Sequence, residues 1–269
     1  MSVLALGASR VGYEVRGYFR APDTLLFTFF FPVMMLALFS SIFGADGDLV
    51  VGPEVEALSA AQLYLPGMLA AGLLLSGFQN LATDIAMERS DGTLKRLGGT
   101  PLSPLSYFLG KFGQVFATGI VQATLLLLVA AFGFGVELPT SLESWTTFAW
   151  VFVLGILTSA LLGIAMSAVP RTGKSAVAVV VPVALILQFT SGVYLFFWLL
   201  PDWLQNLASL FPLVWMARGM RAVFLPEDFA TLEPAGAWEL GWVAVALLIW
   251  LVVGAVLSLL TFRWNRRSG

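Results

Sequence analysis

The charged and polar side chains of this sequence limit the chemistry that it can do. The chain contains no histidine and no cysteine, which removes imidazole bases, thiol nucleophiles and metal sites built on either ligand. Charge is concentrated in one stretch, where six ionisable side chains lie between Asp84 and Arg96. We therefore predict no catalytic residue, no cofactor site and no metal site on this chain.

The stretch from Asp84 to Lys111 has the composition of a protein-docking surface. Gly92 permits a backbone turn, and Leu94 and Leu97 place apolar side chains among the charges. This pattern predicts a short exposed helix that contacts another protein. The alternative is a solvated connection whose basic residues only satisfy the positive-inside rule, and the residue types alone favour neither.

One apparent nucleotide motif, Gly173-Lys174-Ser175, is incomplete. A phosphate-binding loop has a further glycine five residues before Gly173, where this chain has Ala168, and it follows a strand rather than an apolar helix. We interpret Arg171 and Lys174 as a positively charged turn. No ATP site is expected on this chain.

Four polar side chains within apolar stretches are candidates for a substrate path. Gln114, Thr118 and Gln122 recur every four residues and share one helix face, and Gln188 lies near the middle of another apolar stretch. Polar groups in a membrane face protein or water rather than lipid. Interhelical hydrogen bonding is the alternative, and we favour it. A stripe of small residues at the same spacing predicts close helix packing, and it comprises Gly155, Ser159, Gly163 and Ser167.

Membrane helices must position these residues. Only 11% of the chain is charged and 59% is hydrophobic, whereas a soluble domain is about 25% charged, so a water-soluble enzyme or binding domain is excluded. A helix needs about 20 apolar residues to cross the hydrocarbon core. The sequence predicts an all-α integral membrane protein with a single transmembrane domain over residues 1–269. Its six spans are expected at approximately 24–45, 59–83, 107–133, 146–169, 176–200 and 240–262.

Basic and acidic residues are distributed unevenly between the two sides of these spans. Twelve of the 14 lysines and arginines lie on the side of both termini, and 11 of the 16 acidic residues lie on the other. The positive-inside rule places both termini in the cytoplasm of a multi-pass protein of the cell membrane. Residues 202–239 are apolar but interrupted, which predicts re-entrant or interfacial helices on the outer face. Arg218 and Arg221 are expected to anchor this segment beside lipid headgroups.

The segment before the first span mixes aromatic and basic residues. Arg16 and Arg20 are four residues apart and share one helix face. We predict an amphipathic helix in the cytoplasmic interface, with an ordinary basic flank as the alternative.

The order of several short motifs resembles the permease subunits of type-2 ATP-binding-cassette (ABC) transporters. The resemblance is most specific where Glu88-Arg89 is followed by Gly92-Thr93-Leu94, and it extends over essentially the whole chain. The other matching motifs are Lys95-Arg96-Leu97, Pro101-Leu102-Ser103, Leu109-Gly110-Lys111, Leu65-Pro66-Gly67, Phe211-Pro212-Leu213 and Arg218-Gly219-Met220-Arg221.

This resemblance implies a role for each part of the chain. The segment with Arg16 and Arg20 would be the elbow helix, spans two and five would lie near the substrate path, and residues 202–239 would cap that path. The resemblance implies an exporter of the multidrug and antibiotic branch, built from two permeases and two separate ABC ATPase subunits that bind ATP and Mg. Nucleic acid is not an expected partner. A coupling helix would contact the ATPase through Glu88, Arg89, Asp91, Gly92, Thr93, Leu94, Lys95 and Arg96.

Other function classes need residues that the predicted spans lack. A secondary transporter needs an ionisable residue deep in the bundle, and an intramembrane enzyme needs an Asp pair or a His-based catalytic set. Neither occurs in the six runs without Asp, Glu, Lys or Arg, at 24–45, 57–83, 112–136, 144–170, 175–201 and 240–262. A secondary transporter or a membrane scaffold without ATP coupling stays an alternative. The resemblance therefore implies a permease, and the charge-free runs favour a hydrophobic or amphipathic substrate such as a drug, an antibiotic or a lipid-like molecule.

Overall fold

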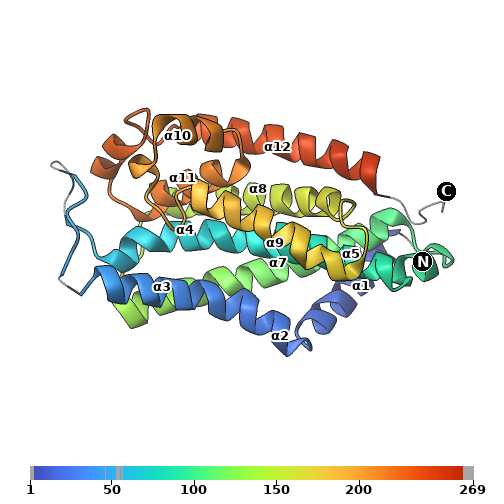
Figure 1. Ribbon diagram of the computed structural model, residues 1–269. Helices are drawn as coiled ribbons and strands as arrows, with labels where there is room; N and C mark the ends of the chain where they lie inside the picture. The colour runs from blue at the N-terminus through green and yellow to red at the C-terminus, as the bar shows by residue number, and fades with distance from the viewer. Residues whose placement is uncertain (1–2, 46, 53–54, 56, 263–269) are drawn as a thin grey trace.

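The computed structural model is a bundle of long helices that run side by side (Figure 1). It describes residues 3–45, 47–52, 55 and 57–262. Within these residues, six helices are long and apolar enough to cross a membrane, which confirms the predicted all-α class and number of spans. They are Leu26–Phe43, Ala60–Ser90, Pro104–Gly133, Leu142–Met166, Gly173–Thr190 and Leu240–Thr261.

Several spans are built from more than one helical segment, and shorter helices connect them. Short π-helical stretches begin the first span, interrupt the second and end the third. In chain order the described elements are α1 (Val3–Tyr18), α2 (Pro22–Leu25), η1 (Leu26–Phe30), α3 (Phe31–Phe43), α4 (Ala60–Leu74), η2 (Leu75–Asn80), α5 (Leu81–Ser90), α6 (Thr93–Gly98), α7 (Pro104–Leu128), η3 (Val129–Gly133), α8 (Leu142–Met166), α9 (Gly173–Thr190), η4 (Phe197–Leu199), α10 (Asp202–Ala208), α11 (Pro212–Phe224), η5 (Glu227–Leu232) and α12 (Leu240–Thr261).

The second span is the central helix of the bundle. Of its most apolar 18 residues, 94% are buried within the chain, against 22% for the first, fifth and sixth spans. It packs on α3, α7, α8 and α11. The second span therefore forms the core, while the first, fifth and sixth spans leave most of their surface for lipid or for another protein.

Small residues on α8 allow the second span to approach closely, as the sequence predicted. A Cβ atom added at Gly77 would lie 2.6 Å from the Cβ of Ser159. One added at Gly163 would run into the backbone carbonyl of Gly77, and one added at Gly155 would contact Leu73. The stripe on α8 is a packing surface.

Three helix boundaries differ from the sequence prediction. The second helix continues to Ser90 rather than ending at 83, so Asp84 lies within a helix and not in a loop. The third begins at Pro104, three residues before the predicted start at 107. The fifth helix ends at Thr190 rather than near residue 200, because Gly192 adopts a left-handed backbone conformation with φ of 77°. From there the chain turns back toward the bundle.

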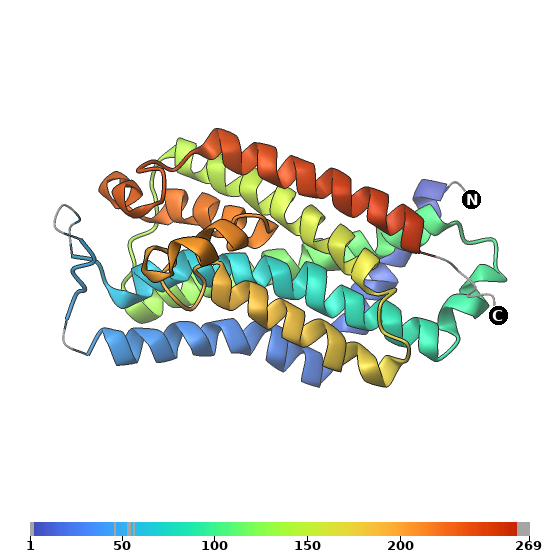
Figure 2. The ribbon, with the colours of Figure 1, turned by 45° about the horizontal axis from the view of Figure 1, so that its top comes forward.

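The segment between the fifth and sixth spans enters the bundle as a bent pair of helices. α10 and α11 meet at an angle of 98°, and α11 packs against α4, α8 and α12 (Figure 2). Most of α11 is buried. This is the interrupted, partly inserted arrangement that the composition of residues 202–239 predicts.

The two ends of the bundle carry different elements. α1, α6 and the last turn of α12 lie at one end, and α10 lies at the other (Figures 1 and 2). α1 lies along α7, where Gly110 and Gly113 leave no room for a side chain against Arg10 and Val11. Arg16 is exposed on α1, and Arg20 is exposed just after it. The basic residues of the tail, Arg263, Arg266 and Arg267, lie outside the described residues.

Candidate functional site

The predicted docking segment divides into an inward part and an exposed part. α5 ends at Ser90, a turn follows at Asp91 and Gly92, and α6 begins at Thr93. Gly92 has φ of 81°, a left-handed conformation that favours glycine. The Asp91 carboxylate accepts a hydrogen bond from the Thr93 amide at 2.8 Å, and bonds from the side chain and amide of Thr93 hold the pKa of Asp91 below its ordinary value. The turn is therefore locally fixed.

α6 presents Lys95 and Arg96 outward and Leu94 inward. Lys95 and Arg96 are exposed, and Arg96 donates a hydrogen bond to the Thr93 hydroxyl at 3.0 Å. Leu94 is only 1% exposed and belongs to the main hydrophobic core. Leu94 therefore attaches α6 to its own bundle, and it is not available as an apolar anchor for a partner.

Arg89 joins the second span to the fourth. Its guanidinium donates to the backbone carbonyl of Ser167 at 2.6 Å and to the Ser167 hydroxyl at 3.2 Å. Ser167 follows the last residue of α8, where unpaired carbonyls and the helix dipole favour a cation. Arg89 therefore makes these contacts within its own chain, close to the start of α6.

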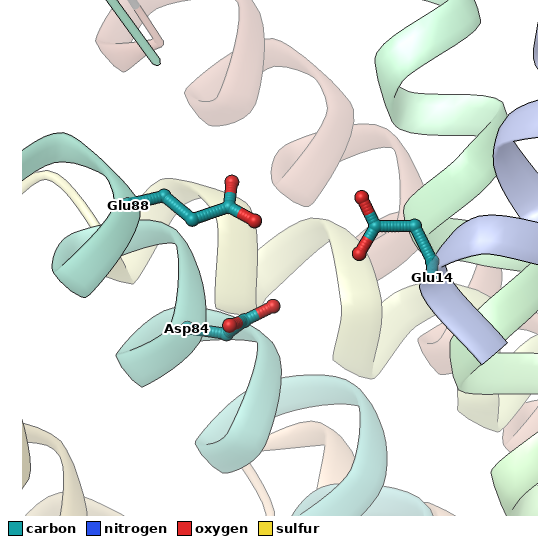
Figure 3. Close-up of side chains that lie close together, drawn as sticks. All are labelled: Glu14, Asp84 and Glu88. Carbon is teal, nitrogen blue, oxygen red and sulfur yellow. The ribbon is translucent and has the colours of Figure 1, made fainter. Parts of the chain in front are cut away.

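A buried lysine connects α1, α5 and α7 beside α6. The Lys111 side chain is fully buried, and its ammonium donates to Glu14 at 3.0 Å, to Glu88 at 2.7 Å and to Asp84. The Tyr107 hydroxyl donates to the second oxygen of Glu88 at 2.6 Å. We call Lys111 and the three carboxylates the Lys111 cluster. Figure 3 shows Glu88 and Asp84 reaching from one helix toward Glu14 on another.

The three carboxylates are close enough to resemble a metal site. One oxygen from each lies within 4.8 Å of the others. The Lys111 ammonium contacts all three groups and supplies the positive charge. The chemistry of this donor set therefore fits an internal ion cluster.

The sequence analysis singled out residues of this cluster but did not predict that they contact one another. Glu88 was predicted to face a partner, yet its carboxylate faces Lys111 and Tyr107. Asp84 and Lys111 have the sequence pattern of loop charges. The residues that Lys111 contacts are 23 to 97 positions away in the chain, and no local pattern reports such pairing.

The polar stripe on α7 is buried, and its members have different surroundings. Thr118 donates back to the carbonyls of Gln114 and Val115. The side-chain amide oxygen of Gln122 accepts a hydrogen bond from the Ser76 hydroxyl in η2 at 2.9 Å, which is the interhelical bond expected for such residues. Gln188 is 1% exposed and accepts a hydrogen bond from the Tyr194 hydroxyl. Gln122 and Gln188 thus contact protein.

A second ion network lies at the other end of the bundle, on α11. Arg218 binds Glu233 at 3.0 Å and Glu239 at 2.8 Å, and Arg221 binds Glu233 at 2.6 Å. Both arginines are at most 4% exposed, so the expectation that they lie beside lipid headgroups is wrong. Burial alone would raise the pKa of the Glu233 carboxyl, but Arg221 and Arg218 hold it below its ordinary value. Glu239 has φ of 49°, and this strained residue is held by Arg218.

Comparisons with known proteins identify the family. Residues 48–260 match the model of the family described as "ABC-2 family transporter protein". The chain is 26% identical over 251 residues to "Putative transport permease ycf38" of Cyanophora paradoxa, which covers 91% of this chain and 83% of that protein. The protein of the same name from Porphyra purpurea is 26% identical over 257 residues, with coverage of 91% and 85%. ABC transporter G family member 20 of Dictyostelium discoideum is 26% identical over 197 residues, which are 72% of this chain and 26% of that protein. Because the family model spans most of a chain with six candidate membrane helices, this multi-pass protein belongs to the ABC-2 family of transporters as a permease.

Proposed function

We propose that this permease is the membrane subunit of an ATP-driven exporter and that α6 is its contact with a separate ATPase. ABC-2 permeases pair with ABC ATPase subunits and lack the ATPase site themselves. The observation that carries the proposal is the attachment of α6. It exposes Lys95 and Arg96, while Leu94 and the Asp91 turn fix it to the second span. A displacement of α6 would therefore reach the central helix directly.

The Lys111 cluster extends this connection to α1. Glu88 lies two residues before the end of α5, and Glu14 lies on α1. Lys111 binds both, so movement of the second span would be shared with the elbow helix. Through its hydrogen bond to Ser167, Arg89 would likewise couple movement of the second span to the end of α8. These contacts support a coupling role for Glu88 and Arg89 through the interior.

The proposed assembly contains two copies of this chain, or this chain and a paralogue, with two ATPase subunits in the cell membrane. The charge asymmetry supports a cytoplasmic location for α1, α6 and the end of α12, which lie together at one end of the bundle. We further propose a hydrophobic or amphipathic cargo, such as a drug, an antibiotic or a lipid-like molecule. The uncharged central portions of the spans support this cargo class.

One observation from the structure favours the alternative of proton-coupled secondary transport. The Lys111 cluster places ionisable groups inside the helices of the second and third spans, which the charge-free runs did not indicate. Its members are paired with one another, however, and the cluster lies at the end of the bundle near α6. We therefore favour ATP coupling, and the energy source is directly testable.

Charge reversal on α6 tests the proposal. Lys95→Glu with Arg96→Glu places two negative charges on the proposed contact, and opposed like charges across an interface cost several kcal/mol. We expect at least tenfold weaker co-purification with the co-expressed ATPase subunit and loss of ATPase stimulation by cargo. Arg171→Glu with Lys174→Glu is the matched control, because these residues undergo the same charge change outside α6. Equal binding by both double variants, or transport driven by a proton gradient without ATP, would contradict the proposal.

A further inference from the structure

A cavity of about 640 Å³ lies between the elbow region, the second span and the fifth span. Residues from α1, α2, η1, η2, α5, α7 and α9 line it. Its apolar side includes Phe27, Val177 and Val181. Its polar side includes Asp84 and Gln114. Volume and mixed lining are those of a site for a small organic ligand.

The side-chain amide of Gln114 faces the cavity. The residue as a whole is only 4% exposed, and it lines the cavity. Among the described residues, none hydrogen-bonds this amide, and its nitrogen and oxygen are not among the fully buried side-chain atoms that lack a partner. The amide of Gln114 is therefore available to a ligand in the cavity.

The charge of the cavity is negative. Its described lining contains Glu14 and Asp84 but no lysine or arginine. The three carboxylates of the Lys111 cluster exceed their two cationic partners, Lys111 and Arg10, by one charge. The Asp84 side chain is 49% exposed, whereas that of Glu14 is 9% exposed. Asp84 pairs with Lys111 but is the more exposed of the two carboxylates that line the cavity, so it is the one that a ligand can reach.

We propose that this cavity binds an amphipathic organic cation. The ammonium group would lie against the Asp84 carboxylate and the side-chain amide oxygen of Gln114. The apolar part would lie along Phe27, Val177 and Val181. Tyrosine rings at the cavity wall would add a cation–π contribution. The identity of the cation as cargo rests on the proposed export function, but its binding requires neither the ATPase nor ATP. An amine-bearing lipid headgroup and a free amphipathic amine share this chemistry.

Direct binding to the purified permease tests the site. The probe is a dansyl-labelled alkyl trimethylammonium, with an analogue that carries a hydroxyl in place of the ammonium as its neutral counterpart. Binding is measured by fluorescence in maltoside micelles, which contain no amine, after subtraction of protein-free micelles. We expect the cation to bind at least tenfold more tightly than the neutral analogue, because charge pairs in a partly buried site are stronger than neutral contacts.

Four variants assign the binding to this cavity. Asp84→Asn and Gln114→Leu should each weaken binding of the cation about tenfold, by loss of a charge partner or of a buried polar contact. Val181→Trp should abolish binding by filling the cavity. Val183→Trp is the matched control, because Val183 is exposed on the same helix and does not line the cavity. Gln114→Leu and Val181→Trp leave the ion pairs of Asp84 intact, so they remain informative if Asp84→Asn does not fold.

The outcomes separate the site from the exporter. Equal affinity for the neutral analogue, or unchanged binding in Gln114→Leu and Val181→Trp, would overturn the site whatever α6 does. Binding at the cavity without any effect of the cation on ATPase activity of the complex would leave the site standing and count against export. Competition by dihexanoyl phosphatidylethanolamine would identify a lipid headgroup as the source of the cation, and its absence would identify a free amphiphile.

Discussion

Lys111 illustrates how strongly a single buried charge can depend on its neighbours. Its ammonium is fully buried and binds three carboxylates from two helices. Removing one partner of a buried ion cluster costs about 3–5 kcal/mol, because the remaining charges are left uncompensated. The cluster therefore fixes the position of α1 relative to α5.

Lys111→Met should lower the free energy of unfolding by about 3–5 kcal/mol, or prevent stable folding altogether. The substituted side chain has a similar length but cannot compensate Glu14, Asp84 and Glu88. The measurement is the yield and melting temperature of the purified protein. Lys95→Met, on exposed α6, is the control and should change stability by less than about 0.5 kcal/mol. Similar melting temperatures for the two variants would show that the cluster contributes little.

The network around Glu233 predicts a pH dependence at the opposite end. The pKa of Glu233 is lowered in the folded protein, so its stabilising effect is present above the unfolded pKa near 4.5 and is lost as the pH falls through the folded pKa. Glu233→Gln should lower stability by about 3–5 kcal/mol at pH 7, since Arg221 loses its counter-charge. The difference in melting temperature between wild type and variant should shrink below pH 4.5. A difference that stays constant from about pH 7 to about pH 3 would contradict the assignment.

At the scale of single residues, the sequence identified charged positions better than their partners. The motif Arg218-Gly219-Met220-Arg221 places two arginines on one face of an otherwise apolar helix, which was the available signal for a buried network. Their acids, Glu233 and Glu239, follow a 3₁₀ turn. The path of that turn depends on tertiary packing, so the pairing could not be derived from spacing.

Among the elements, the second and fourth spans make a very close contact. Gly163→Ala should destabilise the protein by about 1–3 kcal/mol, because the added Cβ would meet the Gly77 carbonyl. Gly241→Ala should be neutral or stabilising, since a Cβ added at that helical glycine would meet no atom within 4 Å and alanine favours the helix. Melting temperatures that move in opposite directions are the expected result. Equal shifts would mean that the two spans can separate without cost.

The existence of the spans could be predicted from charge-free runs, but not every one of their ends. The second helix extends through Asp84 because the charge of Asp84 is paired with Lys111 inside the bundle. In a single sequence Asp84 looks like a loop charge. The fifth helix ends early because of one glycine, Gly192, whose left-handed conformation no hydropathy pattern reveals.

At the scale of the whole molecule, the most apolar helix is not the most buried one, which is the reverse of what is expected in a soluble protein. The central second span has the lowest mean hydropathy of the six, and the sixth span has the highest although little of it is buried. Helices that face lipid must be apolar all round, whereas a central helix can use polar and small residues to contact its neighbours. The low mean hydropathy of the second span is the signal that could have identified it as the core.

The orientation of the whole molecule predicts a labelling pattern. Arg89 binds Ser167 at the end of α8, so Ser90 and the start of α8 lie at opposite ends of the bundle. Because the natural chain has no cysteine, Ser141→Cys and Ser90→Cys each provide a single thiol at an exposed position. A membrane-impermeant maleimide applied to intact cells should label Ser141→Cys and spare Ser90→Cys until the membrane is permeabilised. The reverse pattern would invert the proposed topology.

The tight contact at Gly77 divides the second span into two arms of similar length. At 1.5 Å per residue, about 20 Å separate Gly77 from Ser90 and about 26 Å separate it from Ala60. If the second span turns as one body about this contact, a displacement of α6 produces an opposite displacement of similar size at the other end of the span. Spin labels at Ser90 and Gln62 should therefore report distance changes to α12 of opposite sign when ATP binds to the complex. Changes of the same sign would show that the helix translates as a piston instead.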